Sequence, residues 1–180
     1  HVSSRRQRQM CIRDSFLCNT RKEIVMCNMK LFERMNEGKF TISPLENLNY
    51  KISYLDEDCV AEGGEFFYLS KENILLAGQN RNNLKGAEQM AEKLNVSNLF
   101  IINSSGYHLD TSIAPLFNSE YDCIGIICAK EVFNRNEFKN LKNICDKNHW
   151  DVIEVEHQNI QKSINFRTCL LYTSPSPRDT

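Results

Sequence analysis

The chain has 180 residues, with 22 Lys and Arg against 23 Asp and Glu, and a formal net charge of −1 at pH 7. This balance gives no support to a general nucleic-acid-binding protein, and no apolar run is long enough to span a bilayer. The eight cysteines show neither CxxC spacing nor a Cys/His pattern typical of zinc, so we expect no disulfide scaffold and no metal site.

The two terminal segments differ from the rest of the chain. Residues 1–15 end in RRQRQMCIRDS, and residues 169–180 read CLLYTSPSPRDT. Codons for the first segment, read as the reverse complement, encode Cys-Leu-Leu-Tyr-Thr. Both segments therefore resemble translated adapter DNA around a gene fragment, and we expect them to be disordered. The alternative is a basic arm that binds nucleic acid and a disordered Ser/Pro-rich tail.

We expect the genuine domain at residues 16–168. Without the terminal segments, 17 basic and 21 acidic residues remain, so this region is mildly acidic. Its six scattered cysteines follow no secretory signal, which is typical of a reducing compartment, and we expect a cytoplasmic protein. About 150 residues can bury the core of one domain.

The first part of this region has weak patterning. Residues 24–35 predict a helix, and residues 42–54 an irregular segment with a strand near Tyr50. From Glu62 the signals improve, since GGEFFYL and ILLAG predict two strands joined by a polar turn. NNLKGAEQMAEKL then predicts a helix, and NLFII a further strand. The helix has Asn82 and Asn83 as candidate caps, and its apolar face is Leu84, Ala87, Ala91 and Leu94.

The same order of elements recurs further along the chain. We expect a strand at 109–116, a turn at 118–121, a buried strand at 123–129, a helix at 136–147 and a final strand at DVIEV. A strand-strand-helix-strand unit that repeats after roughly 45 to 50 residues predicts an α/β repeat or propeller. In such a fold each module needs neighbours to cover its faces.

Polar residues lie at equivalent places in the two predicted modules. Glu65 precedes the first strand of one module, and His108 and Asp110 precede the first strand of the next. If the modules are related by rotation about an axis, these carboxylates converge on that axis. Two carboxylates across a cleft suit a planar guanidinium, and Arg81 could bind a carboxylate at the other end of the same ligand.

Three motifs in this order resemble the guanidino-group-modifying superfamily, which includes dimethylarginine dimethylaminohydrolase, arginine deiminase and the amidinotransferases. They are AEGGEFF at 61–67, GQNRNNLKGAEQMAEKL at 78–94 and GYHLDTSIAPL at 106–116. The resemblance covers about residues 50–165. It implies a pentein-type propeller of five modules, of which this chain holds a part, and a small guanidino substrate such as arginine or methylated arginine without a cofactor. Family members use a cysteine thiolate to attack the guanidinium carbon while a histidine moves protons.

The resemblance also implies roles for single residues. His108 corresponds to the general acid/base, and Asp110 to a residue that binds guanidinium nitrogens. Glu65 stands where the family motif EGGD has aspartate, which keeps the charge on a longer side chain. Arg81 corresponds to an arginine that binds the substrate α-carboxylate, with Asn82 in place of the family's threonine.

The resemblance places the nucleophilic cysteine in the fifth module, beyond the part we take as genuine. Cys169 lies in the adapter-like tail, and the predicted positions of Cys123, Cys128 and Cys145 are buried. A hydrolase similar to dimethylarginine dimethylaminohydrolase is the first interpretation, because RNNLKGAE closely resembles the start of the corresponding helix in that family. The alternatives are an amidinotransferase and a non-catalytic guanidino-binding paralogue.

We therefore expect the 180-residue chain to release no citrulline from arginine or methylated arginines, because the thiolate that forms the covalent intermediate is missing. A colorimetric citrulline assay checks this expectation. Citrulline release that disappears in His108→Ala would contradict it.

Overall fold

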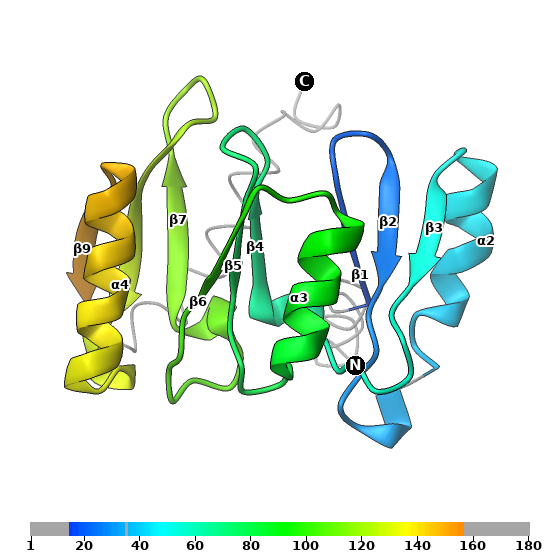
Figure 1. Cartoon of the computed structure of the whole chain (residues 1–180), viewed down its shortest axis with the longest axis horizontal. Helices are drawn as coiled ribbons and strands as arrows, with labels where there is room; N and C mark the ends of the chain where they lie inside the picture. Colours follow the sequence, from blue (N-terminus) through cyan, green and yellow to red (C-terminus); the bar gives the residue numbers. More distant parts are fainter. Residues whose placement is uncertain (1–14, 35, 157–180) are drawn as a thin grey trace, which may run out of the picture. The chain divides into compact units, whose positions relative to one another are not determined.

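The structure is a computed structural model that describes residues 15–34 and 36–156 (Figure 1). The predictions for residues 1–14 and 157–180, which include most of both adapter-like segments, lie outside the described residues. The chain divides into two compact units, residues 1–109 and 110–180, and each unit is described by itself.

The fold is mixed α/β, with three sheets of three strands each in the described residues. The first unit contains two sheets, β1 (Phe16–Cys18), β2 (Glu23–Met26) and β3 (Lys51–Tyr54), and β4 (Phe66–Leu69), β5 (Ile74–Ala77) and β6 (Asn98–Ile101). The second unit contains β7 (Ile113–Phe117), β8 (Cys123–Ala129) and β9 (Asp151–Val155). In every sheet the first two strands are antiparallel and the last two are parallel.

A helix joins the two parallel strands of each sheet, because parallel strands need a crossover connection. These helices are α2 (Lys39–Asn47), α3 (Leu84–Lys93) and α4 (Arg135–Asn148). The strand-strand-helix-strand order expected for two segments is present in both, and it occurs a third time near the N-terminus. No helix in the described part of the chain is long and apolar enough to cross a bilayer.

The helix predicted at residues 24–35 is wrong. This segment begins with β2, whose Ile24 and Val25 are 0% exposed, and continues into a loop and a short 3-10 turn, η1 (Phe32–Arg34). The helix follows later, as α2, which has no buried residue and leaves Phe40 85% exposed. Amphipathic spacing could not predict α2, because no face of this helix is buried and its residues therefore show no apolar stripe.

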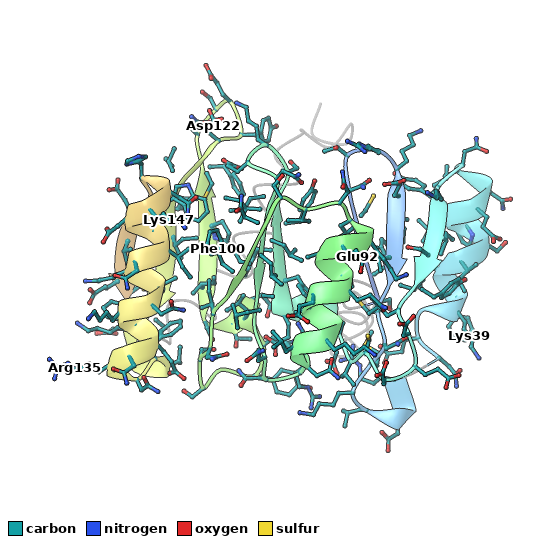
Figure 2. The ribbon with its side chains drawn as sticks, in the orientation of Figure 1. Lys39, Glu92, Phe100, Asp122, Arg135 and Lys147 are labelled. Carbon is teal, nitrogen blue, oxygen red and sulfur yellow. The ribbon has the colours of Figure 1, made fainter. Side chains whose placement is uncertain are left out.

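The core of the first unit lies between strands of both its sheets and α3. Val25 from β2, Leu75 from β5, and Met90 from α3 are each 0% exposed and belong to one cluster. Gly86, Ala87, Met90 and Ala91 form the buried side of α3, whereas Leu84, expected on that face, is 49% exposed. Glu92 lies on the exposed side of the same helix (Figure 2).

Local signals fix both ends of α3. Asn83 is the N-cap, since its side chain accepts from the Gly86 N–H, as expected from its position before the helix. The same Asn83 oxygen accepts from the Val60 N–H at 3.0 Å, so the cap also ties the helix to the preceding segment. Asn95 follows the helix in the left-handed conformation, with φ 55°.

The second unit follows its predicted pattern closely. Strands β8 and β9 match residues 123–129 and DVIEV, while β7 begins later than expected because the turn η3 (Leu109–Thr111) precedes it. Helix α4 opens with a capping box between Asn134 and Glu137. Arg135 and Lys147 mark its first and last turns (Figure 2). The buried side of α4 is Leu141, Ile144 and Cys145.

We predict that Gly86→Ala destabilises the chain, although alanine normally favours a helix by about 1 kcal/mol over glycine. A Cβ at Gly86 would lie 2.2 Å from the Val60 carbonyl oxygen, so α3 would have to move off its support. Overpacking of this kind costs about 1–3 kcal/mol, which a urea titration measures as a lower midpoint. Glu88→Ala, on the exposed side of α3, is the control. A higher midpoint for Gly86→Ala would contradict the close packing.

Candidate functional site

A tight turn places two carboxylates inside the first unit. Glu62 is extended, with φ −120° and ψ 135°, and the 3-10 turn η2 (Gly63–Glu65) follows it directly. The Glu65 N–H donates to the Glu62 carbonyl at 3.0 Å and closes the turn. Both glutamates are 0% exposed. Buried carboxylates are costly without partners, so their surroundings decide whether they can remain charged.

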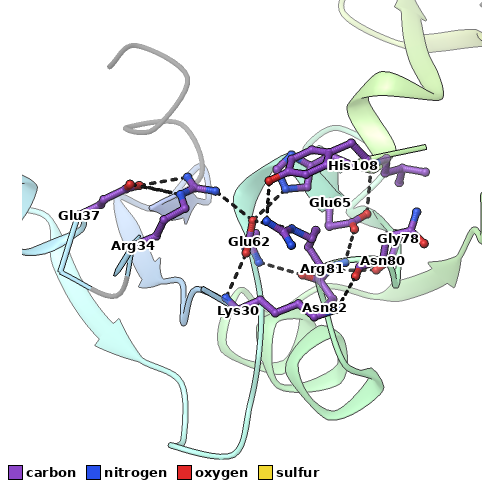
Figure 3. A network of polar contacts seen from close by, with 12 residues as sticks. Lys30, Arg34, Glu37, Glu62, Glu65, Gly78, Asn80, Arg81, Asn82 and His108 are labelled. Carbon is purple, nitrogen blue, oxygen red and sulfur yellow. Dashed lines mark hydrogen bonds and ion pairs between the residues drawn. The ribbon is translucent and has the colours of Figure 1, made fainter. Parts of the chain in front are cut away.

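Donors from three separate segments surround the Glu62 carboxylate (Figure 3). Its Oε2 lies 2.9 Å from His108 Nε2 and accepts from Arg34 Nη1 at 3.1 Å. Arg81 Nε lies 3.6 Å from the same oxygen, and the Lys30 N–H donates to Oε1 at 3.1 Å. Burial alone would raise the pKa of Glu62, but the bonds from His108 and Lys30 and the charge of Arg81 outweigh burial and hold the pKa below 4.5. Glu62 is therefore a carboxylate at neutral pH.

The Glu65 carboxylate binds backbone N–H groups. Its Oε1 accepts from the Arg81 N–H at 2.5 Å, and its Oε2 accepts from the Leu109 N–H at 3.0 Å. Gly78 makes room for it, since a Cβ there would lie 1.9 Å from Oε2. Glu65 thus joins the start of β4 to the loop after β5 and to the segment that carries His108.

Two asparagines hold the loop that presents Arg81. The Asn80 amide donates to the carbonyls of Ser104 and Gly106, at 2.9 and 2.7 Å. The Asn82 amide donates to the Gly78 carbonyl, and its oxygen accepts from the Glu62 N–H at 2.8 Å. Asn82, which stands where the family motif has threonine, therefore has a local structural role, because it ties this loop to the Glu62 turn.

His108 and Arg81 share an aromatic neighbour. The Tyr107 ring lies 4.6 Å from the His108 ring and 4.6 Å from the Arg81 guanidinium carbon. Arg81 Nη2 also donates to the Tyr107 hydroxyl at 2.5 Å. Tyr107 is 58% exposed, whereas His108 is 4% exposed. The arrangement can serve proton transfer, since a carboxylate on Nε2 orients an imidazole and stabilises its charged form.

Three of the four predicted site residues lie in one network. His108, Glu65 and Arg81 belong to the first unit and are joined through Glu62 and backbone groups. Asp110 is the first residue of the second unit and lies in η3. Their roles toward a substrate stay predictions.

The sequence interpretation missed Glu62, Lys30 and Arg34. Glu62 opens the stretch EGGE at 62–65, from which only Glu65 was taken as a site residue, although both glutamates lie just before the apolar run FFYL. Lys30 and Arg34 carried no local signal, because they reach Glu62 from 32 and 28 residues away.

Four thiols of the described residues are poor nucleophiles. Burial raises the pKa of Cys128 to about 11 and that of Cys145 to about 12. Burial also raises the pKa values of Cys18 and Cys59. An attacking cysteine must be a thiolate, so none of these four is prepared for catalysis at neutral pH.

Asp56, Asp58 and Cys59 have ligand atoms within 4.8 Å of one another, and they form the one such group in residues 15–34 and 36–156. Both aspartates are exposed, and Asp58 already pairs with Lys85. Exposed carboxylates of this kind do not by themselves indicate an ion.

No protein-family model matches the sequence, and no curated protein matches it. Solved structures do match. The N-terminal domain of ArgZ, an arginine dihydrolase from the ornithine-ammonia cycle in cyanobacteria, bound to substrate, matches with a TM-score of 0.71 and 18% identity over 85% of this chain and 55% of that chain. A dimethylarginine dimethylaminohydrolase adduct with S-methyl-L-thiocitrulline matches with a TM-score of 0.62 and 17% identity over 84% of this chain and 55% of that chain. The chain shares its fold with these arginine dihydrolase and dimethylarginine dimethylaminohydrolase structures.

This match confirms, at the level of the fold, the resemblance seen in the three sequence motifs. The chain spans about half the length of these structures and 22% of an AgrE chain in complex with L-arginine, which has a TM-score of 0.71 and 18% identity over 85% of this chain. At such identities the likeness shows the shared fold alone, while residue roles depend on the geometry of this chain.

We predict that Glu62 supports stability above about pH 4.5 and that its contribution is lost as the pH falls through its lowered folded-state pKa. Glu62→Gln should cost about 3 kcal/mol at pH 7, because Arg34 and His108 lose their buried counter-charge. The difference from wild type should shrink below pH 4.5. Urea titrations from pH 3 to 7 measure it, with Glu88→Gln as the control. A difference independent of pH would contradict an ionised Glu62.

Proposed function

We propose that this chain contributes the general acid/base and part of the substrate pocket of a cysteine-dependent hydrolase that acts on the guanidinium group of arginine or methylated arginine. The buried Glu62–His108 contact at 2.9 Å carries the proposal, because it lies within a fold shared with an arginine dihydrolase and dimethylarginine dimethylaminohydrolase. The substrate class itself is taken from these similar proteins.

In the proposed reaction a cysteine thiolate attacks the guanidinium carbon and forms a covalent tetrahedral adduct. Protonated His108 gives its proton to the departing amine, and the C–N bond breaks. His108 then takes a proton from the water that attacks the thiouronium carbon, and the thiolate leaves as the product forms. Glu62 orients the ring and stabilises its charged form through both steps. The attacking cysteine is proposed from the resemblance alone. It is none of the four thiols whose pKa values are raised, namely Cys18, Cys59, Cys128 and Cys145.

Arg81 is proposed to bind the substrate α-carboxylate. Its side chain is 15% exposed, and its Nε is buried and makes no hydrogen bond within the described residues. Glu65 fixes the Arg81 backbone, so it would support substrate binding even where it does not touch the substrate. Contacts of Glu65 and Asp110 with guanidinium nitrogens remain part of the proposal, and Glu65→Asp tests the first of them by restoring the family's usual residue.

We also propose that the three strand-strand-helix-strand modules belong to a propeller around a substrate channel. Recurrence of one module with the same strand order in three sheets supports this arrangement. In a propeller the His108 segment and the Glu62 turn would line the channel from neighbouring modules.

Calorimetric titration with L-arginine tests the proposal. We expect Arg81→Gln and Asp110→Asn each to weaken binding by about 10- to 100-fold, since each removes a charge-assisted hydrogen bond to substrate. His108→Ala should change affinity less, because its role is proton transfer. Arg21→Gln, on the exposed loop between β1 and β2, is the control.

In a longer chain that includes the cysteine, His108→Ala should lower kcat by about 10²- to 10⁴-fold. Transfer of the amidino group to an added amine in place of water would identify an amidinotransferase. Binding of L-arginine that is unaffected by both Arg81→Gln and Asp110→Asn would contradict the proposed pocket.

A further inference from the structure

Two carboxylates enclose the guanidinium of Arg34. On one side, Arg34 Nε lies 3.2 and 3.1 Å from the two Glu37 oxygens, and Nη2 lies 3.0 Å from Glu37 Oε2. On the other side, Nη1 donates to Glu62 Oε2 at 3.1 Å (Figure 3). Two carboxylates that bracket a planar cation are the arrangement expected around a guanidino ligand. Here the bracketed guanidinium belongs to the chain itself.

Local structure presents this guanidinium to the site. The Arg34 N–H donates to the Leu31 carbonyl at 3.0 Å, and the Glu37 N–H donates to the Arg34 carbonyl at 2.9 Å. These turns place Arg34 and Glu37 three residues apart on one side of the segment, so their salt bridge forms locally. Nη1 reaches beyond the segment to Glu62. The Arg34 side chain is 15% exposed, so solvent or a ligand can approach it.

A guanidino ligand and Arg34 would compete for the same oxygen. Glu62 Oε2 already accepts from Arg34 and contacts His108 at 2.9 Å, while Oε1 accepts from the Lys30 N–H. A carboxylate oxygen has two lone pairs, and both Arg34 Nη1 and His108 Nε2 lie within hydrogen-bond distance of Oε2. A ligand guanidinium that binds Glu62 Oε2 beside His108 would take the position of Arg34 Nη1.

We propose that Arg34 is a resident guanidinium that occupies the ligand position at Glu62, and that guanidino ligands bind by displacing it. This inference rests on the proposed function of the same site. The apparent affinity is then the intrinsic affinity multiplied by the fraction of molecules in which Arg34 has left Glu62. Arg34 also discriminates among cations, because a compact ammonium replaces a planar forked donor poorly.

The test is the affinity of the full chain for L-arginine, measured by calorimetry for wild type, Arg34→Gln and the matched control Arg21→Gln. We expect Arg34→Gln to bind at least 10-fold more tightly and Arg21→Gln to stay within twofold of wild type. Glu37→Gln keeps the arginine but removes one carboxylate of the bracket, so it should bind about threefold more tightly. This second variant gives a result even where Arg34→Gln does not fold.

Displacement can also be observed directly in the wild type by NMR. The Nε–Hε signal of Arg34 should move during titration with L-arginine, the Arg21 signal should not, and L-lysine should leave both in place. A structural salt bridge alone would keep the Arg34 signal unchanged.

The outcomes separate this inference from the proposed function. L-arginine binding that is equal or weaker in Arg34→Gln, with a static Arg34 signal, overturns the displacement and leaves the proposed function standing. Absence of L-arginine binding in wild type and in both Arg34→Gln and Glu37→Gln overturns both proposals together.

Discussion

The burial of one carboxylate, that of Glu62, organises the first unit. A fully buried charge is tolerated only when partners replace its lost hydration. Those partners come from the segment after β2, the loop after β5 and the segment after β6, so three stretches distant in sequence must meet at one point. The lowered pKa of Glu62 shows that they compensate its burial. The geometry of His108 is a consequence, since the imidazole is one of the groups that Glu62 needs.

Glu65 solves the same problem differently. Its oxygens accept backbone N–H groups of Arg81 and Leu109, which would otherwise be buried polar groups in need of partners. The two glutamates, three residues apart, therefore have different roles. Glu62 contacts charged or titratable side chains, whereas Glu65 fixes the backbone at Arg81 and beside His108. The Gly78 position keeps this second carboxylate in place, as only hydrogen fits beside it.

Local patterns predicted the local parts of this structure. The capped helix after Asn83 and the strand at 123–129 were predictable from spacing alone, because their apolar residues face a core at regular intervals. Helix α2 escaped prediction, since no residue of it is buried. His108, Arg81 and Glu65 were found through motifs, whereas Arg34 acts through a contact across 28 residues that no spacing rule encodes. Sequence patterns thus identified side chains that lie in motifs and missed Arg34, the cation that pairs with the buried Glu62 carboxylate.

An internal guanidinium on a buried carboxylate links stability to binding. Without Arg34, the buried Glu62 carboxylate would keep only the charge of Arg81 at 3.6 Å, the contact with His108 at 2.9 Å and the Lys30 N–H at 3.1 Å among the described residues. Arg34 supplies a permanent positive charge at 3.1 Å and keeps the site compensated while it is empty. The same contact opposes any ligand that needs this oxygen, so a change that improves ligand affinity here removes a partner from a buried charge. Trade-offs of this kind between folding and binding are common at functional sites. In this chain the hydrogen bond from Arg34 Nη1 to Glu62 Oε2 both stabilises the buried carboxylate and opposes ligand binding at that oxygen.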